Sequence, residues 1–410
     1  MAASALSCSG PLQPELPPAG DTLVREQITF GPKNHFFGYI GHVGTIPWNE
    51  SGRYIVALRT DFVDRMPSPD DAADVILLDT TDGYAVRAVD TTRAWNVQQG
   101  TMLFWNPTSP ETQFYFNDRD PQTGKVFTVL YDVAEGRRIR EFRYQDTPVA
   151  NGGVSLDGRR FAAINYARMA RLRPVTGYPL AWDWTEGVSA PEDDGVFVVD
   201  SETGTKRLVV SFHQLADALR RERPEIDSMP LFINHTLWNR SGHTLFFFAR
   251  ANFRRPGRLN AAFTVASDGT GLRRLETHIG GHPEWDAGSL MIGSIAKRQA
   301  VFDVDSQQMV GLIGEADLFP DPEGDIALSP DLDWLANGYK QDGELHYVVH
   351  NRRNGTTYRA GGFDLHGRVS GDLRCDPAPR WNRKGDALLI PGMTEHGTRQ
   401  MFLLRLPDRG

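Results

Sequence analysis

Polar side chains that suit acid–base chemistry and metal binding recur at equivalent places along the chain. The clearest example is "HTLWNRSGHTLFFFA" (235–249), in which a histidine precedes a tryptophan, a polar turn and an apolar run. Imidazole takes up a proton near neutral pH, and imidazole together with carboxylate suits a divalent transition metal. Carboxylates and amides alone would favour calcium or manganese. The residues at these equivalent positions are His35, Gln98, Gln99, His235, His282, Asp325 and Asp376.

A structural explanation competes with the chemical one for each of these residues. A histidine at the start of a strand is more often a hydrogen-bonded loop residue than a ligand, but repetition at equivalent sites favours a shared role for His235 and His282. The tryptophans are interpreted as core residues, and the sequence has no serine-elbow, phosphate-loop, CxxC or HExxH motif. The core tryptophans are Trp48, Trp105, Trp238, Trp285 and Trp381.

The elements that must position these residues form a repeat. Each copy has a short strand, a turn of Asn, Asp, Ser, Pro and Gly, and a second strand rich in apolar residues. A second strand–turn–strand motif, such as "GVFVVDSETGTKRLVV", follows nearly every copy. The period of about 45 to 60 residues is that of a propeller blade. The first motif begins in turn at Ile46, Leu103, Gly152, His235, His282, Ile326 and Ala378.

The sequence therefore predicts an all-β, seven-bladed β-propeller of four-stranded antiparallel blades. The seventh copy ends with "QMFLLRLP" as its third strand, so "TLVREQITF" (22–30) is predicted to supply the fourth strand and close the ring. Residues 1–20 are predicted to be a disordered leader, and residues 21–410 form the propeller. A segment at about 167–194 is too long for a hairpin and is predicted to be a lid-like insertion. "SFHQLADALRRERPE", which comes after it, has helical apolar spacing.

Composition limits the partners. The net charge of −8 lacks a basic face, which argues against nucleic acid and anionic membranes. Two arginine clusters, "RRERPE" and "ANFRRPGR", could meet an acidic ligand or could be solvated loop faces. No run of 18 apolar residues and no signal-peptide pattern occurs. The two cysteines, Cys8 and Cys375, fit a reducing compartment, so a cytoplasmic location is expected.

Five short motifs resemble the oligogalacturonate lyase family: "NHFFGY", "RAWNVQQG", "INHTLWN", "GGHPEW" and "RCDPAPRWNRKG". The resemblance covers nearly the whole chain beyond the leader. It implies a propeller enzyme that cleaves a small acidic oligosaccharide of 4-linked uronic acids by β-elimination. It also implies a manganese-type ion at the mouth of the channel, which binds the sugar carboxylate while a histidine removes the C5 proton.

The resemblance places His282 at the position of the base, and Asp325 and Asp376 at the positions of metal ligands. The family pattern has histidine at these ligand positions and again at Ala378, and alanine cannot bind a metal. Either carboxylates and Gln98 or Gln99 bind the ion, or the chain has lost the metal or the reaction. The alternative function is therefore a catalytically degenerate propeller that binds a carbohydrate or a protein.

The remaining candidates complete the predicted site. His235, Tyr39 as general acid and Arg380 join His282 as catalytic candidates, and the predicted substrate-binding residues are His35, Gln98, Gln99 and Arg168. Tyr39 could equally be a channel-wall aromatic. Arg168 and Arg380 could instead form ion pairs between blades.

Overall fold

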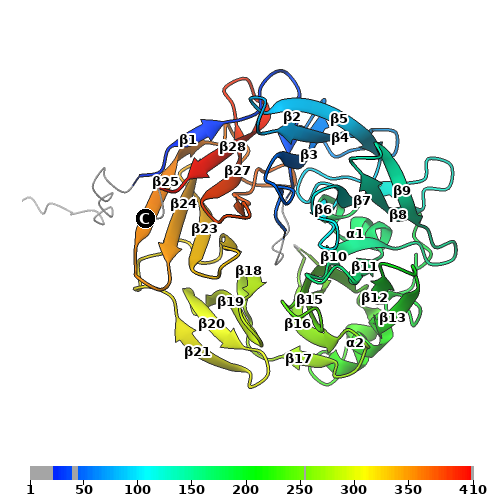
Figure 1. The fold of residues 1–410 in the computed structure, drawn as a ribbon. Coiled ribbons are helices and arrows are strands. Elements are labelled where there is room, and N and C mark those ends of the chain that lie inside the picture. The colour runs from blue at the N-terminus through cyan, green and yellow to red at the C-terminus, as the bar shows by residue number, and fades with distance from the viewer. Residues whose placement is uncertain (1–21, 39–44, 254, 408–410) are drawn as a thin grey trace, which may run out of the picture.

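The computed structural model describes residues 22–38, 45–253 and 255–407, and these form a ring of seven four-stranded antiparallel sheets around a common axis (Figure 1). The predicted seven-bladed β-propeller is confirmed.

Each sheet below is given from its innermost to its outermost strand. Blade 1 comprises β2 (Asn34–Phe36), β3 (Tyr54–Thr60), β4 (Ala73–Asp79) and β5 (Ala85–Thr92). Blade 2 comprises β6 (Phe104–Trp105), β7 (Gln113–Arg119), β8 (Val126–Asp132) and β9 (Arg137–Phe142). Blade 3 comprises β10 (Ala150–Val154), β11 (Arg160–Ile164), β12 (Gly195–Asp200) and β13 (Lys206–Ser211).

The second half of the ring follows the same order. Blade 4 comprises β14 (Phe232–Trp238), β15 (Thr244–Ala251), β16 (Leu259–Ala266) and β17 (Arg273–Leu275). Blade 5 comprises β18 (Gly280–Trp285), β19 (Leu290–Ile295), β20 (Arg298–Asp303) and β21 (Gln308–Leu312). Blade 6 comprises β22 (Asp325–Leu328), β23 (Trp334–Gln341), β24 (Glu344–Asn351) and β25 (Thr357–Asp364). Blade 7 comprises β26 (Arg380–Trp381), β27 (Ala387–Met393), β28 (Arg399–Arg405) and β1 (Arg25–Gln27).

The polar turn of the repeat has a definite hydrogen-bonding role. In blade 4 the side chain of Asn239 accepts hydrogen bonds from the backbone N–H groups of His243 and Thr244, both at 3.0 Å. Gly242 has a φ of 70°, a conformation that glycine adopts without a Cβ penalty. The asparagine and the glycine together reverse the chain between the first and second strands, which explains their spacing after the tryptophan.

The repeated tryptophans join neighbouring blades. The buried indole N–H of Trp285 donates to the carbonyl of Leu237 in blade 4 at 2.9 Å, and that of Trp381 donates to Ala327 in blade 6 at 2.9 Å. Trp238 bonds in the same way to Gly153 in blade 3 at 2.9 Å. These tryptophans are core residues, as predicted, and their polar atoms also fix each inner strand against the one before it.

The N-terminal strand closes the ring, as predicted. β1 pairs with β28 in antiparallel register, with Arg25 opposite Leu404 and Gln27 opposite Phe402. Just before β1, Leu23 is buried and its N–H donates to the carbonyl of Arg359 at 2.7 Å. Closure therefore covers the outer edge of β28, which would otherwise expose unpaired backbone groups.

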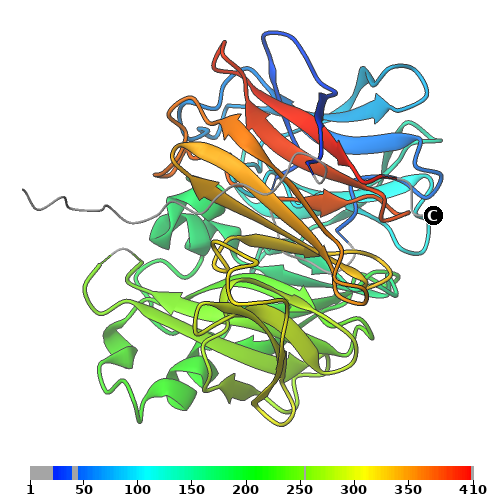
Figure 2. The same ribbon diagram turned by 90° about the vertical axis from the view of Figure 1, so that its left-hand side faces the viewer.

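Two short helices lie on the same face of the ring (Figure 2). α1 (Tyr166–Leu172) begins the long segment between β11 and β12 and is followed by the 3₁₀ turn η2 (Pro174–Thr176). α2 (Phe212–Leu219) begins at a capping box of Ser211 and Gln214 and is followed by η3 (Ile226–Ser228). Its apolar side chains are buried as the sequence spacing predicts. Among the described residues, the helices are all too short and too polar to cross a membrane. The predicted leader, 1–20, lies outside the described residues.

Deleting residues 1–31 should lower the melting temperature by about 5 °C or more, because it removes β1 together with the buried side chains Leu23 and Ile28. Deleting residues 1–20 is the matched control, since it removes none of the contacts described above, and it should leave the melting temperature nearly unchanged. Differential scanning calorimetry of the two truncations measures both values. Equal tolerance of the two deletions would contradict closure by β1.

Candidate functional site

The inner strands of blades 4 and 5 are interrupted at their histidines. The register of β14 shifts between Asn234 and Leu237, and His235 within this bulge has a φ of 60°. β18 has a similar shift between Gly280 and Glu284, which spans His282. The two imidazole rings lie 5.1 Å apart between centroids. A positive φ is costly for a non-glycine residue, and such strain is concentrated at functional sites.

An aspartate from blade 6 holds His282. Nδ1 of His282 lies 2.6 Å from Oδ1 of Asp325, and Oδ2 of Asp325 accepts a hydrogen bond from the N–H of Ala378 at 2.9 Å. Burial alone would raise the pKa of Asp325, but the His282 imidazole and the Ala378 N–H outweigh it and lower that pKa. The carboxylate therefore stays ionised at neutral pH. Contact at Nδ1 selects the tautomer whose basic nitrogen is Nε2.

Asp376, the second predicted metal ligand, is occupied by cations of the chain. Its Oδ1 lies 2.8 Å from Nζ of Lys340 and 2.8 Å from Nε of Arg374. Lys340 also donates to the carbonyl of Val369 at 3.0 Å. The ion pairs leave Asp376 charge-compensated, and only 12% of its side-chain surface is exposed.

The donor set does not fit a manganese site. Within the described ranges, no group of three or more His, Cys, Asp or Glu side chains is placed to hold one ion. Asp325 is engaged by His282 and by a backbone N–H, and Asp376 by two cationic side chains. At Ala378, where an imidazole was expected, the backbone donates to Asp325 and has a φ of 40°. Four partners, namely His282, the N–H of Ala378, Lys340 and Arg374, thus stand where metal–ligand bonds were expected.

Gln98 and Gln99 lie in a loop (residues 95–100) that contacts two segments far from it in the sequence. The side-chain oxygen of Asn96 accepts from the backbone N–H groups of both glutamines, at 3.0 and 2.7 Å. Gln98 donates to the carbonyl of Arg374 at 2.8 Å, and Gln99 donates to the side chain of Asn234 at 3.4 Å. This loop therefore lies beside both the His235 bulge and the segment that carries Asp376.

His35 and Arg380 are buried in other parts of the inner wall. His35 contacts Oε1 of Gln400 through Nδ1 at 2.9 Å, and burial lowers its pKa despite that contact. Arg380, in β26, is 3% exposed and donates to the carbonyl of Pro379 at 2.9 Å. Tyr39 lies outside the described residues.

The placement of Arg168 does not support its predicted role in substrate binding. The side chain is completely buried in α1 and donates to Thr185 at 2.8 Å and to the carbonyls of Val188 at 2.9 Å and Leu231 at 2.5 Å. Its contacts with Thr185 and Val188 hold the two ends of the segment 167–194 together. The same segment reaches the mouth through the carbonyl of Gly177, which accepts from Asn96 at 3.2 Å. Closure of this segment as a lid remains a prediction.

Three residues of this region were not predicted from the sequence as part of the site. Lys340 lies on the second strand of its blade, and Asn234 and Asn96 looked like ordinary turn or strand residues. Asn96 stands in the quoted "WNVQQG", so its position beside the glutamines was a usable signal. Lys340 carried no signal, because its pairing with Asp376 depends on the packing of separate segments.

Comparison with solved structures agrees with the fold. The chain is similar to an oligogalacturonate lyase in complex with manganese, with 15% identity, a TM-score of 0.61 and 95% of each chain covered. It also matches the Cps50 (Swd1) β-propeller domain of Myceliophteria thermophila, with 14% identity, a TM-score of 0.45, and coverage of 88% of this chain and 96% of that one. No family model and no curated protein matches the sequence. At such low identity the first likeness shows the propeller fold alone.

Two residues after His282, Glu284 is a buried carboxyl group that should make stability depend on pH. Its Oε2 accepts from the N–H of Leu328 at 2.8 Å, and burial raises its pKa to about 7 although Arg240 and Arg380 act in the opposite direction. A raised carboxyl pKa means that the folded state binds the proton more tightly than the unfolded state. The stability that the protonated Glu284 carboxyl contributes to the folded state is therefore complete below the unfolded-state pKa near 4.5. This stability is lost as the pH rises through about 7.

The variant Glu284→Gln should therefore gain stability relative to the wild type as pH rises from 5 to 8, by about 1–3 kcal/mol. Urea unfolding at several pH values measures the difference. Glu315→Gln, at an exposed position, is the control and should show no such trend. A difference between wild type and Glu284→Gln that does not change with pH would contradict the raised pKa.

Proposed function

We propose that the chain is a carbon–oxygen lyase that cleaves a short uronic-acid-containing oligosaccharide by β-elimination, with His282 as the base. The observation that supports this most is the contact of 2.6 Å between His282 and the ionised Asp325, with the ring of His235 beside it at 5.1 Å. A carboxylate behind one imidazole nitrogen makes the other nitrogen a better proton acceptor. The distant lyase relationship is consistent with this chemistry.

The reaction needs a base, a proton donor and a positive charge. The proton moves from C5 of the uronate to Nε2 of His282, the C–H electron pair forms the C4–C5 double bond, and the C4–O bond breaks. The departing oxygen takes a proton, for which the adjacent His235 is the candidate donor. Both imidazoles lie in inner strands, where the backbone bulges fix their positions.

Positive charge must stabilise the sugar carboxylate as the C5 proton leaves, since a C–H beside a carboxylate is otherwise a poor acid. Candidate cations are Lys340, whose charge acts on Asp325, and Arg240 and Arg380, whose charges act on Glu284. We assign the stabilising charge to side chains of this kind.

A non-catalytic propeller that binds an acidic carbohydrate is the second candidate. The ion pairs of Asp376 with Lys340 and Arg374 favour it, because they occupy a predicted metal-binding side chain. The two candidates differ in whether the bound sugar is converted.

Replacing His282 by Gln should reduce the formation of unsaturated product by about 10²- to 10⁴-fold, because the C5 proton then has no acceptor. Incubation with trigalacturonate measures this directly, since the conjugated double bond absorbs in the near ultraviolet. His396→Gln is the control, because 81% of its side chain is exposed and it lies outside the site. Equal rates in wild type and His282→Gln would refute the assignment of the base. The absence of product from wild type with any oligo-uronate, with or without added Mn²⁺, would leave the binding function.

Manganese should not bind the wild-type chain stoichiometrically, because the predicted ligands are already engaged. Elemental analysis after dialysis against Mn²⁺ should find well below one ion per chain, and EDTA should leave product formation within about twofold. Ala378→His restores the missing imidazole and is the comparison variant. One Mn²⁺ per wild-type chain, or loss of product with EDTA, would contradict a site built from side chains alone.

A further inference from the structure

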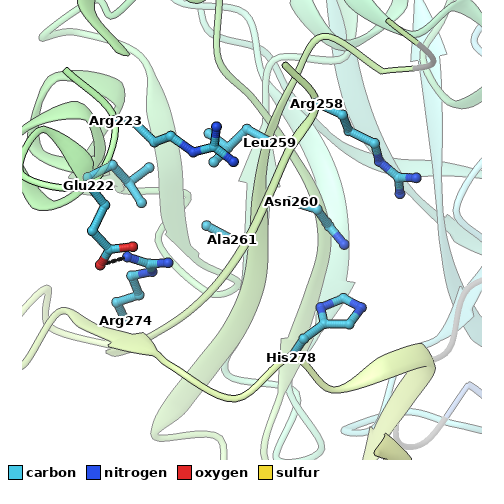
Figure 3. A pocket seen from close by; sticks show the side chains of 9 residues that line it. Glu222, Arg223, Arg258, Leu259, Asn260, Ala261, Arg274 and His278 are labelled. Atoms are coloured by element: carbon cyan, nitrogen blue, oxygen red, sulfur yellow. Dashed lines mark hydrogen bonds and ion pairs between the residues drawn. The ribbon is translucent and has the colours of Figure 1, made fainter. Parts of the chain in front are cut away.

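A cavity of about 440 Å³ lies at the edge of blade 4, beside the end of α2 (Figure 3). It is lined by residues from three places: the chain after α2, the start of β16, and β17 with the segment that follows it. None of the predicted site residues lines it. Its polar lining consists of Glu222, Arg223, Arg258, Asn260, Arg274 and His278. We call this cavity the blade 4 pocket.

The blade 4 pocket carries an excess of positive charge although the whole chain has a net charge of −8. Three arginines and one glutamate line it. Glu222 pairs with Arg274, whose buried Nε has no hydrogen-bond partner among the described residues. Arg223 forms a long ion pair of 3.7 Å with the exposed Glu225, and its charge also acts on Glu222. Figure 3 shows Arg258, Asn260 and His278 on one side of β16, with no carboxylate drawn among them.

A series of contacts connects the blade 4 pocket to the histidines. Oδ1 of Asn260 accepts from Nε of Arg250 at 2.7 Å, and the Arg250 guanidinium lies 4.6 Å from the centre of the Phe248 ring. Phe248 in turn meets the His235 ring edge to face, with 6.0 Å between centroids. Arg250, Phe248 and His235 are buried, so this series of contacts links the pocket lining to the His235 bulge through the interior of blade 4.

Arg250, which donates to Asn260 of the pocket lining, is a further buried arginine next to the pocket. Burial lowers its pKa well below the usual value, and the neighbouring charges of Arg173 and Arg258 lower it further. No ion pair between Arg250 or Arg258 and a carboxylate occurs among the described residues. An anionic ligand would compensate this charge and would gain from the reduced solvent screening.

We propose that the blade 4 pocket binds a carboxylate of a second uronate unit in the same oligosaccharide whose reacting unit lies at His282. This assignment rests on the substrate class of the proposed function and adds a specificity site to it. Guanidinium groups bind carboxylates through paired N–H donors, and the Asn260 amide and His278 imidazole suit sugar hydroxyls. Both arginine clusters of the sequence, 220–225 and 251–258, contribute to the pocket.

Calorimetric titration of trigalacturonate into the His282→Gln protein tests this site without turnover. Arg223→Ala and Arg258→Ala should each weaken binding by about tenfold or more, because each removes a charge-assisted contact. Arg221→Ala is the matched control: it removes the same charge from an exposed position outside the pocket and should change Kd less than about twofold. Monomeric galacturonate, which is too short to reach both sites, should bind all variants alike. Melting temperatures, together with Arg258→Lys, separate loss of the paired donors from loss of folding.

The outcomes distinguish the pocket from the lyase reaction. Equal weakening by Arg221→Ala and Arg258→Ala would overturn the pocket, because general charge attraction would then explain binding. In a second outcome, unsaturated product depends on His282 but both pocket variants bind trigalacturonate as the wild type does. This result would overturn the pocket and leave the lyase proposal standing. Binding that is lost only in the pocket variants, without any product from wild type, would support the pocket and reject the lyase. No binding of trigalacturonate to either the wild type or His282→Gln would overturn both.

Discussion

The hydrogen bonds from buried tryptophans to the preceding blade organise the whole ring. A buried indole N–H needs an acceptor, and in Trp238, Trp285 and Trp381 it finds a carbonyl in the inner region of the neighbouring blade. Each bond sets the height of one inner strand against the next. Pairing of β1 with β28 then fixes the first and last blades together. Residues that precede the tryptophans are consequently held near one end of the channel.

Three consecutive blades supply the candidate site through this arrangement. His235, His282 and Asp325 come from β14, β18 and β22, and bulges in the first two strands turn the imidazoles toward one another. Electrostatics decides what this site can do. Each predicted ligand carboxylate has its own positive or N–H partner, so the charge that a metal ion would supply is already present in side chains.

The sequence allowed prediction of features that repeat or are local. The blade period, the turn chemistry and the closing strand are all encoded in short patterns, and the structure confirms them. The contact of His282 with Asp325 joins two repeats at equivalent positions, so the candidates were identifiable although their pairing was not. The contacts of Arg168 and Lys340 could not be predicted, because their partners come from segments whose packing leaves no periodic signal. Gln98 reaches a carbonyl at Arg374, which is 276 residues away in the chain.

The central claim is that a single acidic-sugar site runs from the histidines to the edge of blade 4. A crystal structure of His282→Gln with trigalacturonate would test this claim most directly. The account predicts one uronate beside residue 282, with its C5 facing the substituted side chain. It predicts a second uronate whose carboxylate contacts Arg258 or Arg223. A ligand bound at the opposite end of the channel, or on another blade, would contradict it.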